Sequence, residues 1–138
     1  MLISDSTDTR PWLLLAGAAP EGAADLLREA GYRVRSAGSG ASLLRRAGSE
    51  PRPDLILLGE TVADQPGLDL LSRLRDDAAA RSVPVLFVAS GGDEELAMAL
   101  GACDCLNLPL RPLVLLARVQ ARLTLHRLLA QSLDGAAA

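Results

Sequence analysis

The sequence predicts an α/β fold in which one five-stranded parallel sheet is doubly wound by five helices. Short runs of Leu, Val and Ile alternate with segments whose apolar residues recur at helical spacing, and 138 residues is the length of one domain. Strands that alternate with helices in this way form parallel sheets with right-handed crossovers. Aromatic residues make up only 2% of the chain, so the core is expected to consist of aliphatic side chains packed between helices and sheet.

The first two elements establish the pattern. Residues 12–16 (WLLLA) form a continuous apolar run between Pro11 and Gly17, as expected of a strand buried on both faces. Residues 21–32 follow with apolar side chains at helical spacing, and Gly31 marks the expected end of this helix.

The same alternation continues to the end of the chain. Four more strands are predicted at residues 33–37, 54–58, 84–90 and 103–107. Four more helices are predicted at residues 41–48, 67–77, 93–102 and 111–133. Asp93 is placed to cap the helix that it begins, so Gly91-Gly92-Asp93-Glu94 is interpreted as a turn leading into that helix.

The domain is expected to occupy residues 11–125. Residues 1–10 are polar and unpatterned and are predicted to be a disordered tail. Residues 126–138 are expected to extend the last helix and end in a C-terminal tail. At 1.5 Å per residue the predicted last helix is about 34 Å long, which exceeds what one face of such a sheet covers.

The charge pattern argues against nucleic acid and membranes as partners. The chain has 17 acidic residues against 14 basic ones, every basic residue is Arg, and the net charge is −3. A mildly acidic domain without a basic stripe has no electrostatic footprint for nucleic acid or anionic lipid. No apolar run approaches the ~18 residues of a membrane span, and no signal sequence is recognisable, so a cytoplasmic location is expected.

The cysteines and the single histidine offer no catalytic or metal-binding constellation. Cys103 and Cys105 fall two residues apart on one predicted strand, a poor geometry for a disulfide, and are interpreted as reduced thiols. His126 has no partner that would complete a nucleophilic triad or a multi-histidine metal site.

Residues 53–58 (PDLILL), with Pro66-Gly67-Leu68 and the following LLSRLRD, resemble the third strand and third helix of the response-regulator receiver family. The resemblance continues in register through PVLFVAS and GGDEELAMALGACDCLNLPL to LLARVQARL, and covers roughly residues 11–125. It implies the flavodoxin-like fold of CheY-type receivers, with an extended last helix.

The resemblance also implies where a phosphorylation site would lie. Receivers hold Mg²⁺ with two acids after the first strand, accept the phosphoryl group on an Asp after the third strand, and contact it with a hydroxyl and a Lys after the fourth and fifth strands. In this sequence those positions fall, in order, on Gly17 and Ala18, Gly59, Ala89 and Leu108.

None of these positions retains the required side chain. A register shift of one residue would offer Glu60 or Ser90, but alternation along a strand predicts that Glu60 points away from the direction of Gly59. No shift supplies Lys, because the sequence contains none. The chain is therefore expected to be a degenerate pseudo-receiver that binds neither Mg²⁺ nor another cofactor and is not an enzyme. The family also implies a cis peptide at Leu108-Pro109, and it places Cys105 where many members carry an aromatic switch residue.

The expected function is a phosphorylation-independent interaction module of the two-component type. The last helices are expected to contact a protein partner, an output domain or a second copy in a homodimer. The expected interaction face comprises Cys105, Val119, Leu123, His126, Leu129 and Leu133. The first alternative is a small-molecule sensor whose ligand occupies the space left by the missing carboxylates. A second is an active receiver with an unusual phosphoacceptor, and the residues after 125 could instead fray.

Overall fold

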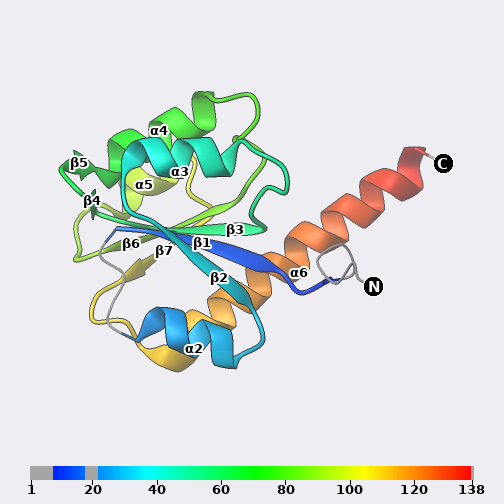
Figure 1. The fold of residues 1–138 in the computed structure, drawn as a ribbon, viewed down its shortest axis with the longest axis horizontal. Coiled ribbons are helices and arrows are strands. Elements are labelled where there is room, and N and C mark those ends of the chain that lie inside the picture. Colours follow the sequence, from blue (N-terminus) through cyan, green and yellow to red (C-terminus); the bar gives the residue numbers. More distant parts are fainter. Residues whose placement is uncertain (1–7, 18–21, 138) are drawn as a thin grey trace, which may run out of the picture.

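The computed structural model describes residues 8–17 and 22–137. Five parallel strands form its main sheet in the order β2-β1-β3-β6-β7 (Figure 1). The order reverses direction once, as in a doubly wound sheet. The strands are β1 (Trp12–Ala16), β2 (Arg33–Ala37), β3 (Leu55–Gly59), β6 (Val85–Ala89) and β7 (Asp104–Asn107). The predicted fold is confirmed, and β1 and β2 have the predicted bounds.

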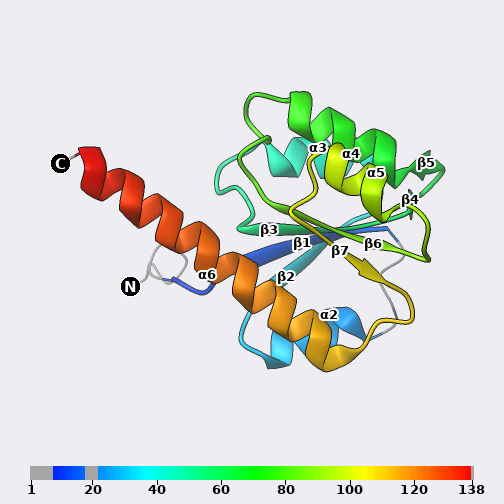
Figure 2. The same ribbon diagram turned by 180° about the vertical axis from the view of Figure 1, so that it is seen from behind.

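Helices cover both faces of this sheet. One face carries α3, α4 and α5, and the other carries α2 and α6 (Figures 1 and 2). Their bounds are α2 (Ala23–Glu29), α3 (Gly40–Ala47), α4 (Gly67–Asp76), α5 (Glu94–Ala99) and α6 (Pro112–Ala137). The helices at α2 and α5 are shorter than predicted. The last helix is longer than predicted, since it continues through Gly135 although glycine disfavours a helix interior by about 1 kcal/mol.

Each face of the sheet has its own apolar layer. Every residue of β3 and β6 is buried, which explains why these strands read as unbroken apolar runs. Phe87, the only phenylalanine, is fully buried on the α3–α5 side. On the opposite side Leu27 of α2 and Val119 of α6 are fully buried against the sheet. None of the helices within the described ranges is both long and apolar enough to cross a bilayer.

The starts of α3 and α5 differ in how they are capped. Ser39 caps α3, because its hydroxyl accepts a hydrogen bond from the Ser42 amide at 3.1 Å. Asp93 occupies the corresponding position before α5, but its side chain makes no capping hydrogen bond. Its backbone has φ −109° and ψ 7°, whereas a capping residue is typically extended, so the predicted cap is wrong.

A short antiparallel ribbon between β3 and α4 was not predicted. It pairs β4 (Thr61–Val62) with β5 (Gln65–Pro66), and Ala63 between them adopts a φ of 53°. Strands of two residues are too short to show an alternating pattern. The ribbon lies beside the carboxyl ends of the main strands, where the candidate site was predicted.

The predicted tail falls partly outside the described residues. Within the described part, Asp8 forms an ion pair with Arg10 at 2.9 Å and lies 3.6 Å from Arg33 of β2. The neighbouring Arg10 guanidinium, through its hydrogen bonds to the Asp8 carboxylate, lowers the pKa of that group to about 2.

Candidate functional site

The carboxyl ends of β1, β3 and β6 meet at one edge of the sheet. Gly17 follows β1 with a φ of 95°, in the left-handed region that favours glycine. A Cβ on Gly17 would lie 3.1 Å from the Gly59 Cα and 2.8 Å from the Thr61 carbonyl oxygen. The two backbone segments are therefore too close together to leave room for a side chain at Gly17.

The structure brings together four of the five predicted site positions. Ala89, fully buried, ends β6 beside Gly59, and its carbonyl accepts a hydrogen bond from the Leu108 amide at 2.8 Å. Ala18 lies outside the described residues. The Leu108-Pro109 peptide is cis, as predicted. The Leu108 side chain packs against the apolar layer on the α2 and α6 side of the sheet.

This donor set does not fit the magnesium ion of a phosphorylatable receiver. Gly17, Gly59, Ala89 and Leu108 contribute no side-chain oxygen or nitrogen, whereas Mg²⁺ binds to carboxylates and water. Within residues 8–17 and 22–137, no group of three or more His, Cys, Asp or Glu side chains is arranged to hold a metal ion.

A carboxylate and a hydroxyl do meet one residue beyond the predicted positions. The Ser90 hydroxyl donates a hydrogen bond to the Glu60 carboxylate, with Oγ and Oε2 3.1 Å apart. Sequence reasoning considered both residues but missed their contact, because alternation applies within a strand and both residues follow a strand end. One feature of the sequence does indicate this contact. Glu60 and Ser90 each follow the last residue of a strand, and these two parallel strands are neighbours in the sheet.

Gly67 packs the start of α4 against this edge. Its amide donates a hydrogen bond to the Glu60 carbonyl at 2.6 Å. A Cβ at this position would fall on the Gly59 carbonyl oxygen and would also lie 3.1 Å from the Phe87 ring. Glycine is therefore required here by close packing, which explains its retention in the motif that carries the family resemblance.

The two cysteines are free and half-buried, so neither forms a disulfide. The pKa of the Cys103 thiol is raised mainly by burial. Burial also raises the pKa of Cys105, and the negative charges of Glu94, Asp104, Asp93 and Glu60 add to the rise. Both thiols are thus disfavoured as thiolates, which are the reactive form.

We expect both cysteines to react slowly with iodoacetamide in the folded protein at pH 8. A raised pKa lowers the thiolate fraction at every pH below it, and burial limits access. Alkylation should be at least several-fold slower than in urea, where both thiols regain ordinary pKa values. Both cysteines lie in one tryptic peptide, so fragmentation of that peptide by tandem mass spectrometry would follow each cysteine separately. Equal rates in the two conditions would contradict the expectation.

The predicted interaction face on α6 needs correction. Val119 is fully buried and Leu123 is 8% exposed, because both pack against the sheet and belong to the core of this chain. They are four residues apart, so they continue the buried stripe of the helix. His126 and Leu129 are exposed. Leu133 lies within α6, but its side chain is outside the described part, and Cys105 lies on β7, half-buried.

The exposed leucines of α6 form a different surface from the predicted face. Leu125, Leu128 and Leu129 are 45%, 56% and 56% exposed. Their spacing of three and four residues places them on neighbouring positions of one side of the helix. We call these three residues the leucine patch. It follows the last buried core residue of α6, in the part of the helix that projects from the sheet (Figure 2).

Comparisons with known proteins agree with this architecture. Residues 18–120 match the family model described as the response regulator receiver domain. The transcriptional regulatory protein GltR of Pseudomonas aeruginosa is 33% identical over 100 residues, which cover 70% of this chain and 41% of GltR. The phosphate regulon regulatory protein PhoB of Klebsiella pneumoniae is 36% identical over 76 residues, which cover 53% of this chain and 33% of PhoB. The chain therefore spans less than half the length of these two relatives.

Solved structures show the same fold. A crystal structure of a response regulator from Chloroflexus aurantiacus has a TM-score of 0.74 at 28% identity, covering 84% of this chain and 99% of that one. The receiver domain of a Luxo repressor protein from Vibrio parahaemolyticus reaches 0.78 at 19% identity, covering 89% and 97%, and supports the fold alone. With most of its length matched by the family model, the chain belongs to the response regulator receiver domain family.

Proposed function

We propose that this receiver domain works without phosphorylation, as a protein-interaction module of a two-component system in the cytoplasm. The observation that carries the proposal is the identity of the residue that ends β3. Gly59 occupies the phosphoacceptor position and has no side chain to attack a phosphoryl group. The neighbouring positions at Gly17, Ala89 and Leu108 add no group that could hold a metal or stabilise phosphoryl oxygens.

The charge around this edge supports the proposal. Three acidic side chains, Glu60, Asp93 and Glu94, lie close enough to Cys105 to raise the pKa of its thiol. A receiver balances such acids with a metal ion and a Lys, and this sequence contains no Lys. Phosphoryl donors are anions, so the uncompensated carboxylates disfavour their approach.

We expect the protein to remain unmodified after incubation with acetyl phosphate and Mg²⁺. Intact-mass spectrometry at neutral pH would detect an acyl phosphate as an added phosphoryl group. Gly59→Asp is expected to remain unmodified as well, because the metal-binding acids, the hydroxyl and the Lys would still be absent. A phosphorylatable receiver treated in parallel serves as the positive control.

The Glu60 carboxylate is the group most able to overturn this proposal. A stoichiometric, acid-labile phosphoryl adduct on the wild-type protein would contradict phosphorylation independence. Glu60→Gln would then identify the acceptor, since loss of the adduct in this variant would establish an unusual phosphoacceptor. The Ser90 hydrogen bond would survive the substitution, because an amide oxygen also accepts from a hydroxyl.

The proposed output surface is the projecting part of α6. We propose that residues 11–125 form the receiver unit and that residues 126–138 extend it. The leucine patch is apolar and accessible, and helices with such a stripe commonly pack against another helix. A second copy of this chain is the proposed occupant, which gives a homodimer through α6, and a partner protein or output domain would engage the same surface.

A further inference from the structure

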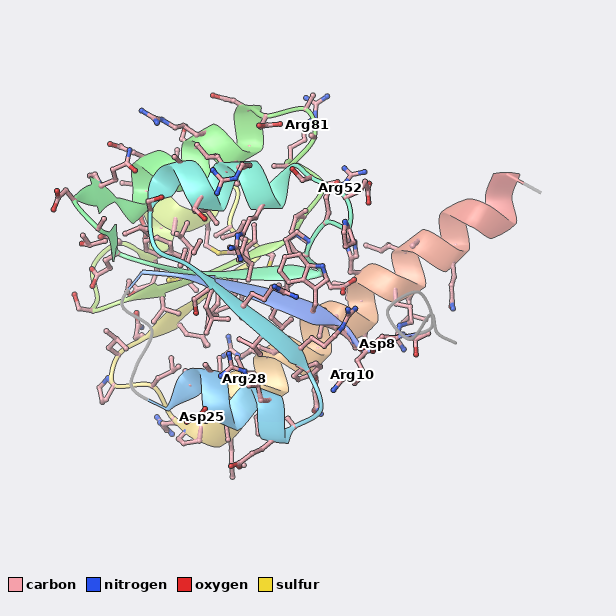
Figure 3. The ribbon with its side chains drawn as sticks, viewed as in Figure 1. Asp8, Arg10, Asp25, Arg28, Arg52 and Arg81 are labelled. Atoms are coloured by element: carbon pink, nitrogen blue, oxygen red, sulfur yellow. The ribbon has the colours of Figure 1, made fainter. Side chains whose placement is uncertain are left out.

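A concave site lies at the other end of the sheet from Gly59. Its cavity has a volume of about 760 Å³ and is lined at the starts of β1 and β2 and near the ends of α2 and α3. Arg10 and Arg28 flank β2 on this side of the molecule (Figure 3). The volume is within the range of small-molecule sites, about 300–1,000 Å³. We call it the arginine cavity.

Five arginines line this cavity, and three of them are held in place. Arg10 is paired with Asp8 at 2.9 Å, and the Arg10 carbonyl accepts a hydrogen bond from Arg33 at 2.7 Å. Arg28 donates to the Val34 carbonyl at 3.2 Å. These contacts fix the guanidinium groups around the cavity, so their positions do not have to be ordered when a ligand binds.

The other two arginines of the cavity carry charge that the surrounding protein does not balance. Among the residues that the structure describes, the guanidinium groups of Arg35 of β2 and Arg46 of α3 make neither a hydrogen bond nor an ion pair. Glu50 is the only acidic residue that lines the cavity in the described part of the chain, and its carboxylate accepts two hydrogen bonds from Arg52. Guanidinium groups bind phosphate oxygens in a bidentate manner. The cavity therefore has the charge of a site for a multivalent anion.

The cavity also contains the chain's only Trp and only Tyr. The Trp12 indole donates a hydrogen bond to the Pro51 carbonyl at 3.2 Å, which orients the ring at the start of β1. Tyr32 is half-buried, and burial raises the pKa of its phenol. Aromatic side chains next to arginines provide stacking surface beside phosphate-binding groups.

We propose that the arginine cavity binds a small phosphorylated ligand that carries a planar ring, of the nucleotide class. The arginines would hold the phosphates, and the aromatic side chains would contact the ring. This inference goes beyond the proposed function, because it concerns the amino end of the sheet and does not depend on chemistry at Gly59. The arginine cavity lies at the opposite end of the sheet from the space left by the missing carboxylates, where the sequence suggested a small-molecule ligand.

The single Trp makes binding directly measurable. We expect ADP to change Trp12 fluorescence saturably at constant ionic strength. Pyrophosphate should compete with ADP but bind about tenfold more weakly, because it lacks the ring. Adenosine, which lacks the phosphates, should bind more weakly still. An ADP titration without a saturable change into the millimolar range, or pyrophosphate binding as tightly as ADP, would overturn the proposal.

Two neighbouring arginines on α3 provide a matched pair of variants. Arg46→Gln should weaken ADP binding about tenfold, because it removes one phosphate-binding group from the cavity. Arg45→Gln makes the same change of charge one residue away, at an exposed position that does not line the cavity, and should leave binding unchanged. Equal weakening by both variants would show general charge attraction and contradict a built site.

The variants must be compared as folded proteins. Thermal melts followed by circular dichroism should coincide for the two variants without ligand, and ADP should raise the melting temperature of Arg45→Gln more than that of Arg46→Gln. A ten-residue oligoglutamate peptide tests the other class of anion. If it displaces ADP and binds more tightly, the cavity is a peptide site and the proposal is wrong.

Discussion

Gly67→Ala is expected to lower the free energy of unfolding by about 2–3 kcal/mol, a typical cost of forcing extra volume into packed backbone. The added Cβ would meet the Gly59 carbonyl, and backbone cannot rotate away as the tip of a side chain can. Relief would require α4 to move away from β3, which would also disturb the contact with Phe87. Urea denaturation followed by circular dichroism would measure the loss.

Gly38→Ala is the control for this prediction. A Cβ at Gly38 would meet nothing within 4 Å, and the change restricts the unfolded chain. Its unfolding midpoint should stay at or slightly above that of the wild type. Coinciding midpoints for Gly67→Ala and Gly38→Ala would show that the junction between β3 and α4 adjusts without cost, and would contradict the packing argument.

Replacing the leucine patch with aspartate should convert the proposed homodimer to a monomer. The variant combines Leu125→Asp, Leu128→Asp and Leu129→Asp. Burying three leucines contributes several kcal/mol to an interface, and buried aspartates would oppose association, so we expect dimerisation to weaken at least about a hundredfold. The domain itself should remain folded, because all three side chains are exposed within one chain. Sedimentation velocity across micromolar concentrations would measure the change.

Two exposed positions on another side of α6 provide the control. Arg127→Asp with Ala130→Asp makes the same change of charge in the same stretch of helix, at positions that are not three or four residues from a leucine of the patch, and dimerisation should persist. Leu123→Asp is unsuitable, because Leu123 is buried in the core and the variant would unfold. A wild-type protein that sediments as a monomer at high micromolar concentration and binds no partner through α6 would contradict the proposed output.

The fold was predictable because strands that are buried on both faces consist of apolar residues. The run at residues 12–16 is apolar throughout, and the structure places β1 there without change. The length of the predicted last helix indicated that α6 extends past the sheet. The sequence did not show which side of this helix is exposed. Val119 and Leu123 fit a coiled-coil seam and a core stripe equally well, and only the position of the helix against the sheet separates the two.

The edge of the sheet at Gly59 could be predicted from the sequence, whereas the arginine cavity could not. Gly17, Gly59, Ala89 and Leu108 were found from the resemblance to the receiver family, because each follows or ends a recognisable strand. The arginine cavity was not predicted, because its arginines come from separate segments between Arg10 and Arg46, and scattered arginines read as a solvated surface. The Glu60–Ser90 contact was missed for a related reason, since loops leave the alternation that orders side chains within a strand.

The projecting part of α6 has a mechanical consequence. Its last described core side chain is Leu123, and the helix continues to Ala137, about 21 Å farther at 1.5 Å per residue. A tilt of about 10° at Leu123 would displace that far end by about 4 Å, a shift of the size seen when packed elements switch. Tyr32, which lines the arginine cavity, lies close to this part of α6. Burial raises the pKa of the Tyr32 phenol, and Gln120 and Arg127 of α6 act in the opposite direction. Since the far part of α6 has no described core contact, a small adjustment around Tyr32 would produce a larger displacement at the far end of the helix.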